Sequence, residues 1–235
     1  MKNYIILFLF AILSASCSNE NETPTITQNP IRNLNYLALG DSYTIGQSVC
    51  ENCRFPVQLQ DSIKNYLSSS DNISLKIVAQ TGWTTTNLKA AIANENLNAT
   101  YDLVTLLIGV NNQYQNKPFG LYETEFPELL QTAITLAKGN LNHVIVVSIP
   151  DYAFTPFGQS ISNPSNISNQ LDNYNSFAKN YAESLGVTFV NITDITREGL
   201  NNPTLVASDN LHPSELAYTE FVKRILPVAK IILGV

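Results

Sequence analysis

The sequence predicts an α/β domain built on a parallel sheet. Five short runs of branched and aliphatic residues alternate with segments of helical periodicity, and turn-forming residues bound each run. Strands that are buried on both faces of a sheet read as continuous apolar runs, and their alternation with helices is typical of a three-layer fold. The chain has 235 residues, 44% of them hydrophobic, which suits one substantial domain of this kind.

Residues 1–16 read as an export signal that precedes this domain. Lys2 comes before an apolar stretch at 4–13 that is too short to span a bilayer, and small residues at 14–16 lead to Cys17. The pattern resembles a bacterial lipoprotein signal, which implies cleavage before Cys17 and attachment of lipid to its sulfur. Leu13 lies one position further from the cysteine than in the usual lipobox, so plain secretion is the alternative.

Residues 17–33 are expected to form a tether, because the segment is polar and acidic and contains two stiffening prolines. The expected organisation is therefore a signal peptide at 1–16, a tether at 17–33 and a single domain at 34–235. We expect an exported protein that contacts the membrane only through its N-terminal lipid, on the periplasmic face or at the cell surface.

The elements of the domain follow from the periodicity of its apolar residues. The expected strands are 36–39, 75–79, 103–108, 144–149 and 187–190, each short and bounded by turn formers. The expected helices are 55–67, 88–93, 123–137, 167–185 and 215–233. In the first of these helices, apolar residues recur at helical spacing at Val57, Leu59, Ile63 and Leu67.

Two connections are longer than such a fold needs. Residues 112–122 and 151–164 follow the third and fourth strands, at the edge of the sheet where their carboxyl ends lie. Long connections in this position are usually functional. Their aromatic residues are therefore expected to form the walls of a substrate pocket, and these are Tyr114, Phe119, Tyr152, Phe154 and Phe157.

Two further cysteines, Cys50 and Cys53, are expected to form a small disulfide, as a close pair usually does in an exported chain. A zinc site is disfavoured, because it would need two more soft ligands and no further cysteine is left to supply them. A redox pair is the weaker alternative, because such a pair opens a helix directly after a strand, whereas this pair follows the Gly-Asp-Ser turn by a few residues.

The charge of the chain argues against nucleic acid as a partner. The chain has 13 Lys and Arg against 19 Asp and Glu, and its basic residues form no stripe.

The first strand ends abruptly at Gly40-Asp41-Ser42, which places a hydroxyl where open α/β sheets bind their ligands. A serine becomes a nucleophile only when a base takes its proton. His143 stands at the amino end of the fourth strand, away from this edge, and is expected to be a surface residue. His212 lies just before the last helix, and Asp209, three residues earlier, could hold its Nδ1–H.

Acyl transfer also needs hydrogen-bond donors aimed at the developing oxyanion. Three candidates follow three different strands: the backbone N–H of Ser42, the backbone N–H of Gly82 and the side-chain amide of Asn111. Each alone is commonly a simple turn residue. Their shared position at strand ends is what makes the set informative.

In order along the chain, Gly40-Asp41-Ser42, Gly82, Gly109-x-Asn111 and Asp209-x-x-His212 resemble the four signature blocks of the SGNH, or GDSL-type, hydrolases. The resemblance covers the chain from about residue 34 to its end. It implies a flavodoxin-like sheet of five parallel strands and ester hydrolysis through an acyl-serine intermediate, without a metal or cofactor. Ser42 would be the nucleophile, His212 the base and then the acid, and Asp209 its orienting partner. Ser42, Gly82 and Asn111 would form the oxyanion hole.

Two positions depart from the family pattern. Tyr43 stands where the family has leucine, and Asn112 stands where aspartate is frequent, which affects the support of Asn111. The substrate class stays open between lipid-like acyl esters and acetylated polysaccharides. A cell-surface binding lipoprotein that has lost catalysis is the alternative from another class. A flavin-binding protein is disfavoured, because no phosphate-cradling glycine pattern follows the first strand.

Overall fold

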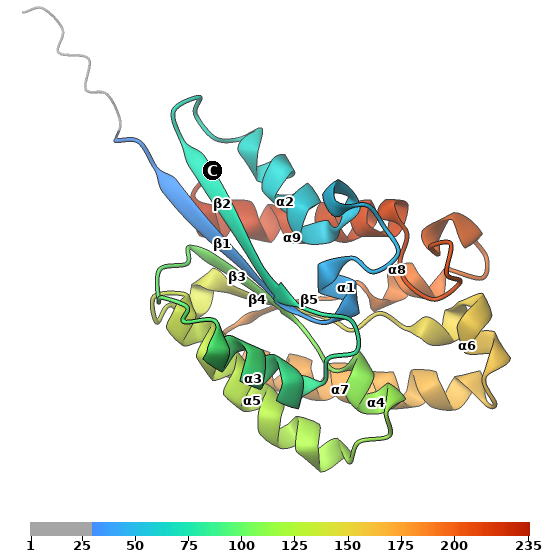
Figure 1. Cartoon of the computed structure of the whole chain (residues 1–235). Helices are drawn as coiled ribbons and strands as arrows, with labels where there is room; N and C mark the ends of the chain where they lie inside the picture. The colour runs from blue at the N-terminus through green and yellow to red at the C-terminus, as the bar shows by residue number, and fades with distance from the viewer. Residues whose placement is uncertain (1–29) are drawn as a thin grey trace, which may run out of the picture. The chain divides into compact units, whose positions relative to one another are not determined.

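The computed structural model describes residues 30–235. The expected signal peptide, Cys17 and nearly all of the expected tether lie outside the described residues. From Pro30 onward the chain forms one sheet with helices on both of its faces (Figure 1). No helix within residues 30–235 is long and apolar enough to cross a membrane.

The five strands lie in the order β2-β1-β3-β4-β5 and every neighbouring pair is parallel, which confirms the expected sheet. Their bounds are β1 Asn33–Gly40, β2 Asn72–Ala79, β3 Leu103–Leu107, β4 Val144–Val147 and β5 Thr188–Val190. The chain builds outward from β1 first to one side and then to the other. The crevice at this reversal, beside the carboxyl ends of β1 and β3, is where open α/β sheets bind ligands.

The central strands are hydrophobic because helices cover both of their faces. Residues Tyr36 to Leu39 of β1 are completely buried. The hydroxyl of Tyr36 is satisfied inside the core, 2.9 Å from Oγ1 of Thr105 on β3. Tyr36 is therefore buried with its phenol hydroxyl in a hydrogen bond, as buried polar groups usually are.

Long helices form the two outer layers. On one face, α2 (Phe55–Lys64) packs beside α9 (Glu215–Leu233), and on the other lie α3 (Thr85–Asn94), α5 (Phe119–Leu136) and α7 (Pro164–Ser184) (Figure 1). Shorter helices connect them: α1 Ser42–Ile45, η1 Glu51–Cys53, α4 Val110–Tyr114, η2 Leu141–His143, η3 Tyr152–Phe154, α6 Pro156–Ser160, α8 Thr193–Arg197 and η4 Pro203–Leu205.

The two connections that the sequence presents as long loops are partly helical. Residues 110–114 form α4, and α5 begins at Phe119, earlier than its apolar periodicity predicts. Phe119 extends the core by packing edge-on against Tyr174, at 4.9 Å between ring centroids. In the second connection, Thr155 caps α6 by accepting the N–H of Gly158, and Pro156 occupies the first turn.

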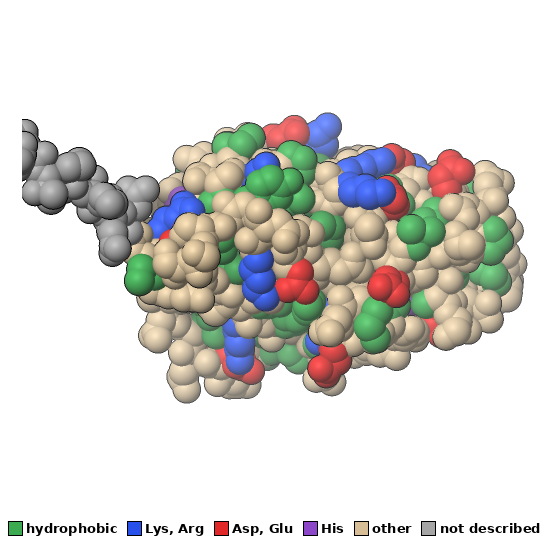
Figure 2. Space-filling model, turned by 90° about the horizontal axis from the view of Figure 1, so that it is seen from above, with side chains coloured by type: hydrophobic (Ala, Val, Ile, Leu, Met, Phe, Trp, Pro, Cys, Tyr) green, Lys and Arg blue, Asp and Glu red, His purple; other side chains and the backbone are tan. Residues whose placement is uncertain are grey.

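The surface carries charges of both signs next to one another. On the face shown in Figure 2, Lys and Arg side chains stand beside Asp and Glu side chains and do not gather into one basic field. Helices α2 and α9 carry such pairs at helical spacing, Lys64 with Asp61 and Lys223 with Glu220. This arrangement is that of a solvated face.

Candidate active site

Residues from four separate segments meet at the carboxyl edge of the sheet. Ser42 follows β1, Gly82 follows β2 and Asn111 follows β3, and these three strands are neighbours in the sheet. Together with His212 they line one cavity of about 280 Å³. Residues that are far apart in the sequence therefore share one site.

The turn that presents Ser42 depends on the absence of a side chain at Gly40. A Cβ on Gly40 would collide with Oγ1 of Thr44 and would lie 2.5 Å from the carbonyl oxygen of Leu107. The close approach lets the chain pass directly from β1 into α1, whose first residue is Ser42. Asp41 caps this short helix by accepting the backbone N–H of Tyr43 at 3.0 Å.

The side chain of Asp41, the residue before Ser42 in this turn, is completely buried. Burial raises the pKa of Asp41 to about 7, although hydrogen bonds from the backbone N–H groups of Tyr43 and Gly109 oppose the rise. The second oxygen, Oδ2, has no hydrogen-bond partner among residues 30–235. A carboxyl group in such surroundings is held largely protonated below neutral pH.

Asp209 and His212 lie on one tight turn. Oδ2 of Asp209 is 2.6 Å from Nδ1 of His212, and Oδ1 accepts the backbone N–H groups of Leu211 and His212 at 3.0 Å. Asn210 has a φ of 64°, the left-handed conformation that asparagine tolerates. A bridge between Val206 and Pro213 closes the turn.

These contacts fix the orientation of the imidazole. With the proton on Nδ1 facing Asp209, Nε2 is left as an acceptor. The ring of Tyr43 packs edge-on against His212, with 5.7 Å between centroids. The tyrosine that departs from the family pattern is thus buried against the imidazole and also lines the cavity.

Ser48 is a neighbour of this pair that the sequence does not predict. Its hydroxyl donates to Oδ2 of Asp209 at 2.6 Å. Burial opposes ionisation of Asp209, but hydrogen bonds from Ser48, from the His212 side chain and from the backbone outweigh it and lower the pKa to about 2. No motif or periodicity marks this loop serine, so no sequence signal could have identified it.

Side chains of α4 and of its C-terminal cap hold the turn that follows β2. Nδ2 of Asn111 donates to the carbonyl of Trp83 at 3.0 Å, and Nε2 of Gln115 donates to the carbonyl of Gly82 at 2.9 Å. Gly82 has a φ of 85°, which a residue with a side chain rarely adopts. One N–H of the Asn111 amide remains for a ligand in the cavity, because a side-chain amide carries two donors.

Asn112 connects α4 to α3 through a reciprocal pair of hydrogen bonds. Its Oδ1 accepts the backbone N–H of Thr85 at 2.9 Å, and its Nδ2 donates to Oγ1 of the same residue at 2.7 Å. The Thr85 hydroxyl then donates to the buried carboxylate of Glu125 at 2.5 Å. An aspartate at 112 could not make the second bond as a donor, so the departure from the family pattern suits the local network.

Three of the five aromatic residues expected as pocket walls line this cavity: Tyr114, Tyr152 and Phe157. The other two lie elsewhere. Phe119 packs on Tyr174 as the first residue of α5, and Phe154 packs against the hydrophobic core. Their separation has a simple cause, since the helical turns of α5 and η3 direct neighbouring side chains to different sides.

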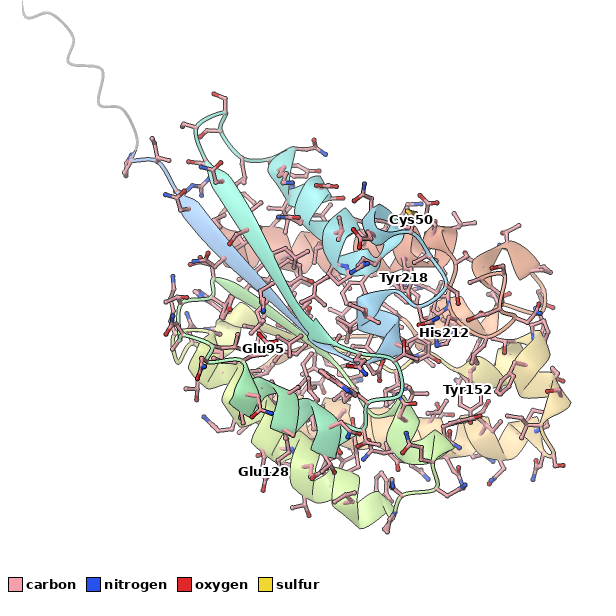
Figure 3. The ribbon with its side chains drawn as sticks, viewed as in Figure 1. Cys50, Glu95, Glu128, Tyr152, His212 and Tyr218 are labelled. Atoms are coloured by element: carbon pink, nitrogen blue, oxygen red, sulfur yellow. A yellow bond between two sulfur atoms is a disulfide. The ribbon has the colours of Figure 1, made fainter. Side chains whose placement is uncertain are left out.

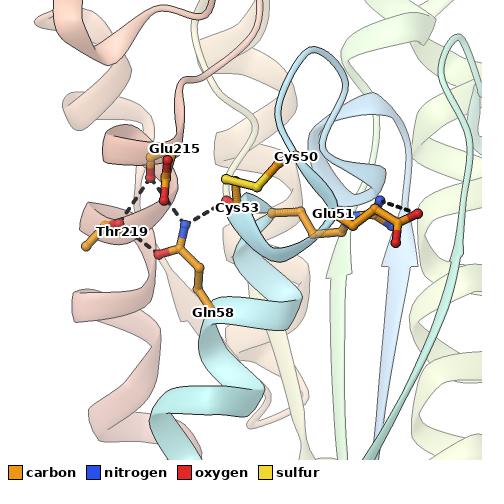
Figure 4. The surroundings of a disulfide bond; sticks show 7 residues. Cys50, Glu51, Cys53, Gln58, Glu215 and Thr219 are labelled. Carbon is orange, nitrogen blue, oxygen red and sulfur yellow. Dashed lines mark hydrogen bonds and ion pairs between the residues drawn. A yellow bond between two sulfur atoms is a disulfide. The ribbon is translucent and has the colours of Figure 1, made fainter.

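The expected disulfide between Cys50 and Cys53 is confirmed. It closes the 3-10 turn η1. Nε2 of Gln58 donates to the carbonyls of Cys53 and Glu215 (Figure 4). The hydroxyl of Thr219 donates to Oε1 of the same glutamine. This links the disulfide turn to α9, the helix that follows His212. In Figure 3, Cys50, His212 and Tyr152 lie toward the same end of the sheet.

His143 lies apart from these residues, at the end of η2 where β4 begins. This is the amino edge of the parallel sheet, opposite the cavity. Within residues 30–235, no three His, Cys, Asp or Glu side chains gather closely enough to hold a metal ion.

The sequence of residues 38–219 matches the GDSL-like lipase/acylhydrolase family. The match extends over most of the chain and includes Ser42, Gly82, Asn111, Asp209 and His212. The protein belongs to the GDSL-like lipase/acylhydrolase family. Ester hydrolysis is the chemistry that this membership supports at the level of the family.

Solved structures of other GDSL-like and α/β hydrolases share the fold. A variant of Axe2, an acetyl xylan esterase from Geobacillus stearothermophilus, superposes with a TM-score of 0.64 at 19% identity, covering 85% of this chain and 96% of that one. A lipolytic G-D-S-L family protein from Veillonella parvula gives a TM-score of 0.61 at 18% identity, covering 83% and 97%. LAE5, an α/β hydrolase enzyme from the metagenome of Lake Arreo, gives 0.63 at 18% identity, covering 86% and 97%. No curated protein sequence matches the chain.

Proposed function

We propose that this GDSL-family protein is a serine esterase that cleaves carboxylic esters through an acyl-serine intermediate. One observation carries the proposal: Ser42, Gly82, Asn111 and His212 line a single cavity, and Asp209 holds the imidazole from behind. A nucleophile, a base with an orienting carboxylate and donors for an oxyanion are the parts that acyl transfer requires.

In the proposed reaction, Nε2 of His212 takes the proton from Oγ of Ser42 as this oxygen attacks the ester carbonyl carbon. The tetrahedral intermediate collapses, the bond to the leaving oxygen breaks, and the imidazolium returns the proton to the departing alcohol. Water then attacks the acyl-serine with His212 as base. The products are a carboxylic acid and free Ser42.

We assign the stabilisation of the oxyanion to three donors, the backbone N–H groups of Ser42 and Gly82 and the side-chain amide of Asn111. Such donors stabilise charge that develops only in the transition state. The assignment is supported by the hydrogen bonds that fix Asn111 and the Gly82 turn before any substrate binds. Donors that are already oriented need no reorganisation during the reaction.

The walls of the cavity favour a small apolar acyl group. Tyr114, Tyr152 and Phe157 form one aromatic wall, with Tyr114 6.0 Å from Tyr152 and 6.3 Å from Phe157 between ring centroids. A volume of about 280 Å³ is at the lower end for ligand sites, so it suits a short acyl chain better than a long one.

A second candidate function, carbohydrate O-deacetylation, is favoured by a neighbouring hollow. This hollow of about 280 Å³ is lined by four carboxamides, a lysine and two aromatic rings: Gln113, Asn116, Gln170, Asn173, Lys117, Phe119 and Tyr174. Carboxamides and aromatic rings suit a polyhydroxylated leaving group. Gln113 also accepts the hydroxyl of Tyr152 at 2.8 Å, which places the hollow next to the wall of the catalytic cavity.

Turnover of p-nitrophenyl acetate and of longer acyl esters by the wild type and by Ser42→Ala tests the proposal. We expect hydrolysis by the wild type only, with acetate and short chains preferred. An acetylated oligosaccharide assayed beside p-nitrophenyl acetate separates the two candidates, since a deacetylase would have the higher kcat/KM on the sugar ester. A wild type that turns over none of these esters would favour a non-catalytic binding protein.

We also propose that the enzyme acts outside the cytoplasm, anchored through a lipid on Cys17. The proposal is supported by the signal-like pattern of residues 1–17 and by a disulfide, which oxidising compartments favour. Metabolic labelling with a fatty acid, followed by membrane fractionation, tests it. Label and membrane association should both be lost in Cys17→Ala, whereas labelling that survives this substitution would refute the anchor.

A further inference from the structure

Among the hydrogen bonds of residues 30–235, the carboxylate of Asp209 has two side-chain partners, His212 and Ser48. Its hydroxyl donates to Oδ2, the same oxygen that faces Nδ1 of His212, and both distances are 2.6 Å. Oδ1 accepts two backbone N–H groups at the same time. The carboxylate is therefore bound at both oxygens, and the bond from Ser48 comes from a different part of the chain.

The loop that carries Ser48 follows directly after the α1 helix that begins at Ser42. Gly46 ends α1 in the left-handed conformation, and Ser48 itself has a φ of 67°. For a serine this backbone conformation is unfavourable and needs support from its surroundings. The chain thus adopts an uncommon backbone conformation at the residue whose hydroxyl meets Asp209.

Several contacts supply this support. Thr81 donates to Oε1 of Gln47 at 2.6 Å, and the N–H of Val49 donates to the carbonyl of Gly46 at 3.3 Å. Two residues after Ser48, Cys50 enters the disulfide with Cys53. The loop of residues 46–50 is therefore fixed on both sides of Ser48.

The same loop touches both halves of the proposed catalytic machinery. Gln47 contacts Thr81, the residue before Gly82 in the proposed oxyanion hole, and Ser48 contacts Asp209. A loop that is covalently continuous with Ser42 therefore bridges the oxyanion side and the acid–base side of the cavity. This arrangement gives the contact a role beyond local loop stability.

We propose that Ser48 is a positioning residue that orients Asp209 toward His212, and that the Cys50–Cys53 turn keeps Ser48 in place. This inference rests on the proposed esterase function. The donated hydrogen bond stabilises the ionised carboxylate and restricts its rotation, so that Oδ2 stays in line with Nδ1. Ser48 does not touch the reacting atoms and acts only through Asp209.

The primary test compares Ser48→Ala and Ser48→Gly with the wild type on p-nitrophenyl acetate. Both remove the hydroxyl, and glycine adopts a φ of 67° without strain, so equal losses would exclude loop strain as the cause. We expect kcat to fall about tenfold in both variants with KM unchanged. Ser184→Ala is the matched control, because it removes an exposed serine hydroxyl bonded to the Tyr181 carbonyl on α7.

A double-mutant cycle with Asp209→Asn shows whether Ser48 acts through the carboxylate. We expect Ser48→Ala to lower kcat in the wild-type background and to have no further effect in the Asp209→Asn background. Thermal unfolding of each variant provides the readout for a purely structural role. An equal loss of kcat in both backgrounds, or a kcat of Ser48→Ala within about twofold of wild type, would overturn the inference.

The contribution of the disulfide is tested in the same way. Replacing both cysteines by alanine should lower kcat in the wild type and change it much less in Ser48→Ala, because the hydroxyl that the turn positions is already absent. Additive effects would show that the turn does not act through Ser48. A Ser42→Ala variant as active as the wild type would instead refute the proposed function, which keeps the two failures distinct.

Discussion

Oδ2 of Asp209 lies 2.6 Å from Nδ1 of His212, while Oδ1 of the same carboxylate accepts the backbone N–H groups of the turn that carries this histidine. Oδ1 therefore stabilises the turn, and Oδ2 fixes the tautomer and the orientation of the imidazole. A substitution at residue 209 can remove the second effect and keep the first.

Asp209→Asn should keep the fold and lower kcat on the order of 10⁴-fold. The asparagine oxygen can still accept the backbone N–H groups, but an amide N–H facing Nδ1 favours the wrong tautomer of His212. Steady-state kinetics with p-nitrophenyl acetate and circular dichroism check both expectations. A loss of less than about tenfold would show that the carboxylate is not needed to orient the base.

Asn111→Ala should lower kcat about 10²- to 10³-fold with a small effect on KM, as removal of one oxyanion donor does in other enzymes. Gln115→Ala is the matched control, because Gln115, the residue that caps α4, also donates to the turn after β2 but does not line the cavity. Its kcat should change far less. Equal effects of the two substitutions would mean that Asn111 serves only to hold the turn.

The sequence predicts the sheet well because the signal is local. The buried parts of β1, β3 and β4 are apolar except at Thr105, whose hydroxyl pairs with that of Tyr36. The candidate residues could be named for a related reason: the chemistry needs a few residue types, and each stands just after a strand or just before a helix.

Other features depend on contacts between distant segments, and no local pattern in the sequence predicts them. Ser48 meets Asp209 across most of the length of the chain, and the support of the Gly82 turn by Asn111 and Gln115 requires α4, a short helix hidden in an apparent loop. Phe119 could not be separated from the pocket aromatics by composition alone. Its place, packed against the edge of the core beside a different hollow, is decided by where α5 begins.

The buried carboxyl group of Asp41 should make stability fall as pH rises. Its pKa is about 7 in the folded protein, against the ordinary aspartate value of 3.8 that applies in the unfolded chain. Between these values the folded state holds a proton that the unfolded state has lost. Unfolding then releases a proton, and stability falls by up to about 1.4 kcal/mol per pH unit in this window. Below about pH 4 and above about pH 7 the contribution is constant.

Asp41→Asn isolates this contribution, since asparagine can accept the same backbone N–H groups without ionising. The difference in free energy of unfolding, variant minus wild type, should increase between about pH 4 and about pH 7 and then level off. Urea unfolding at a series of pH values measures it. A difference that does not change with pH would show that Asp41 titrates alike in the folded and unfolded states.

Phe157→Ala should shift the acyl preference toward longer chains. Phe157 closes the aromatic wall of the cavity, and its backbone bond to Asn210 does not depend on the side chain. Each added methylene that becomes buried is worth about 0.8 kcal/mol, so the ratio of kcat/KM for hexanoate to that for acetate should rise roughly tenfold or more. Phe154→Ala, outside the cavity, should leave the ratio unchanged. An unaltered ratio in Phe157→Ala would place the acyl group elsewhere.

Covalent labelling shows directly whether the oxygen of Ser42 is the nucleophile that takes up the acyl group. After reaction with a fluorophosphonate, peptide mass mapping should find a single adduct on Ser42 in the wild type. Labelling should be strongly reduced in His212→Ala and absent in Ser42→Ala, with both variants folded. An adduct on another residue, or equal labelling of Ser42→Ala, would show that Ser42 is not the nucleophile.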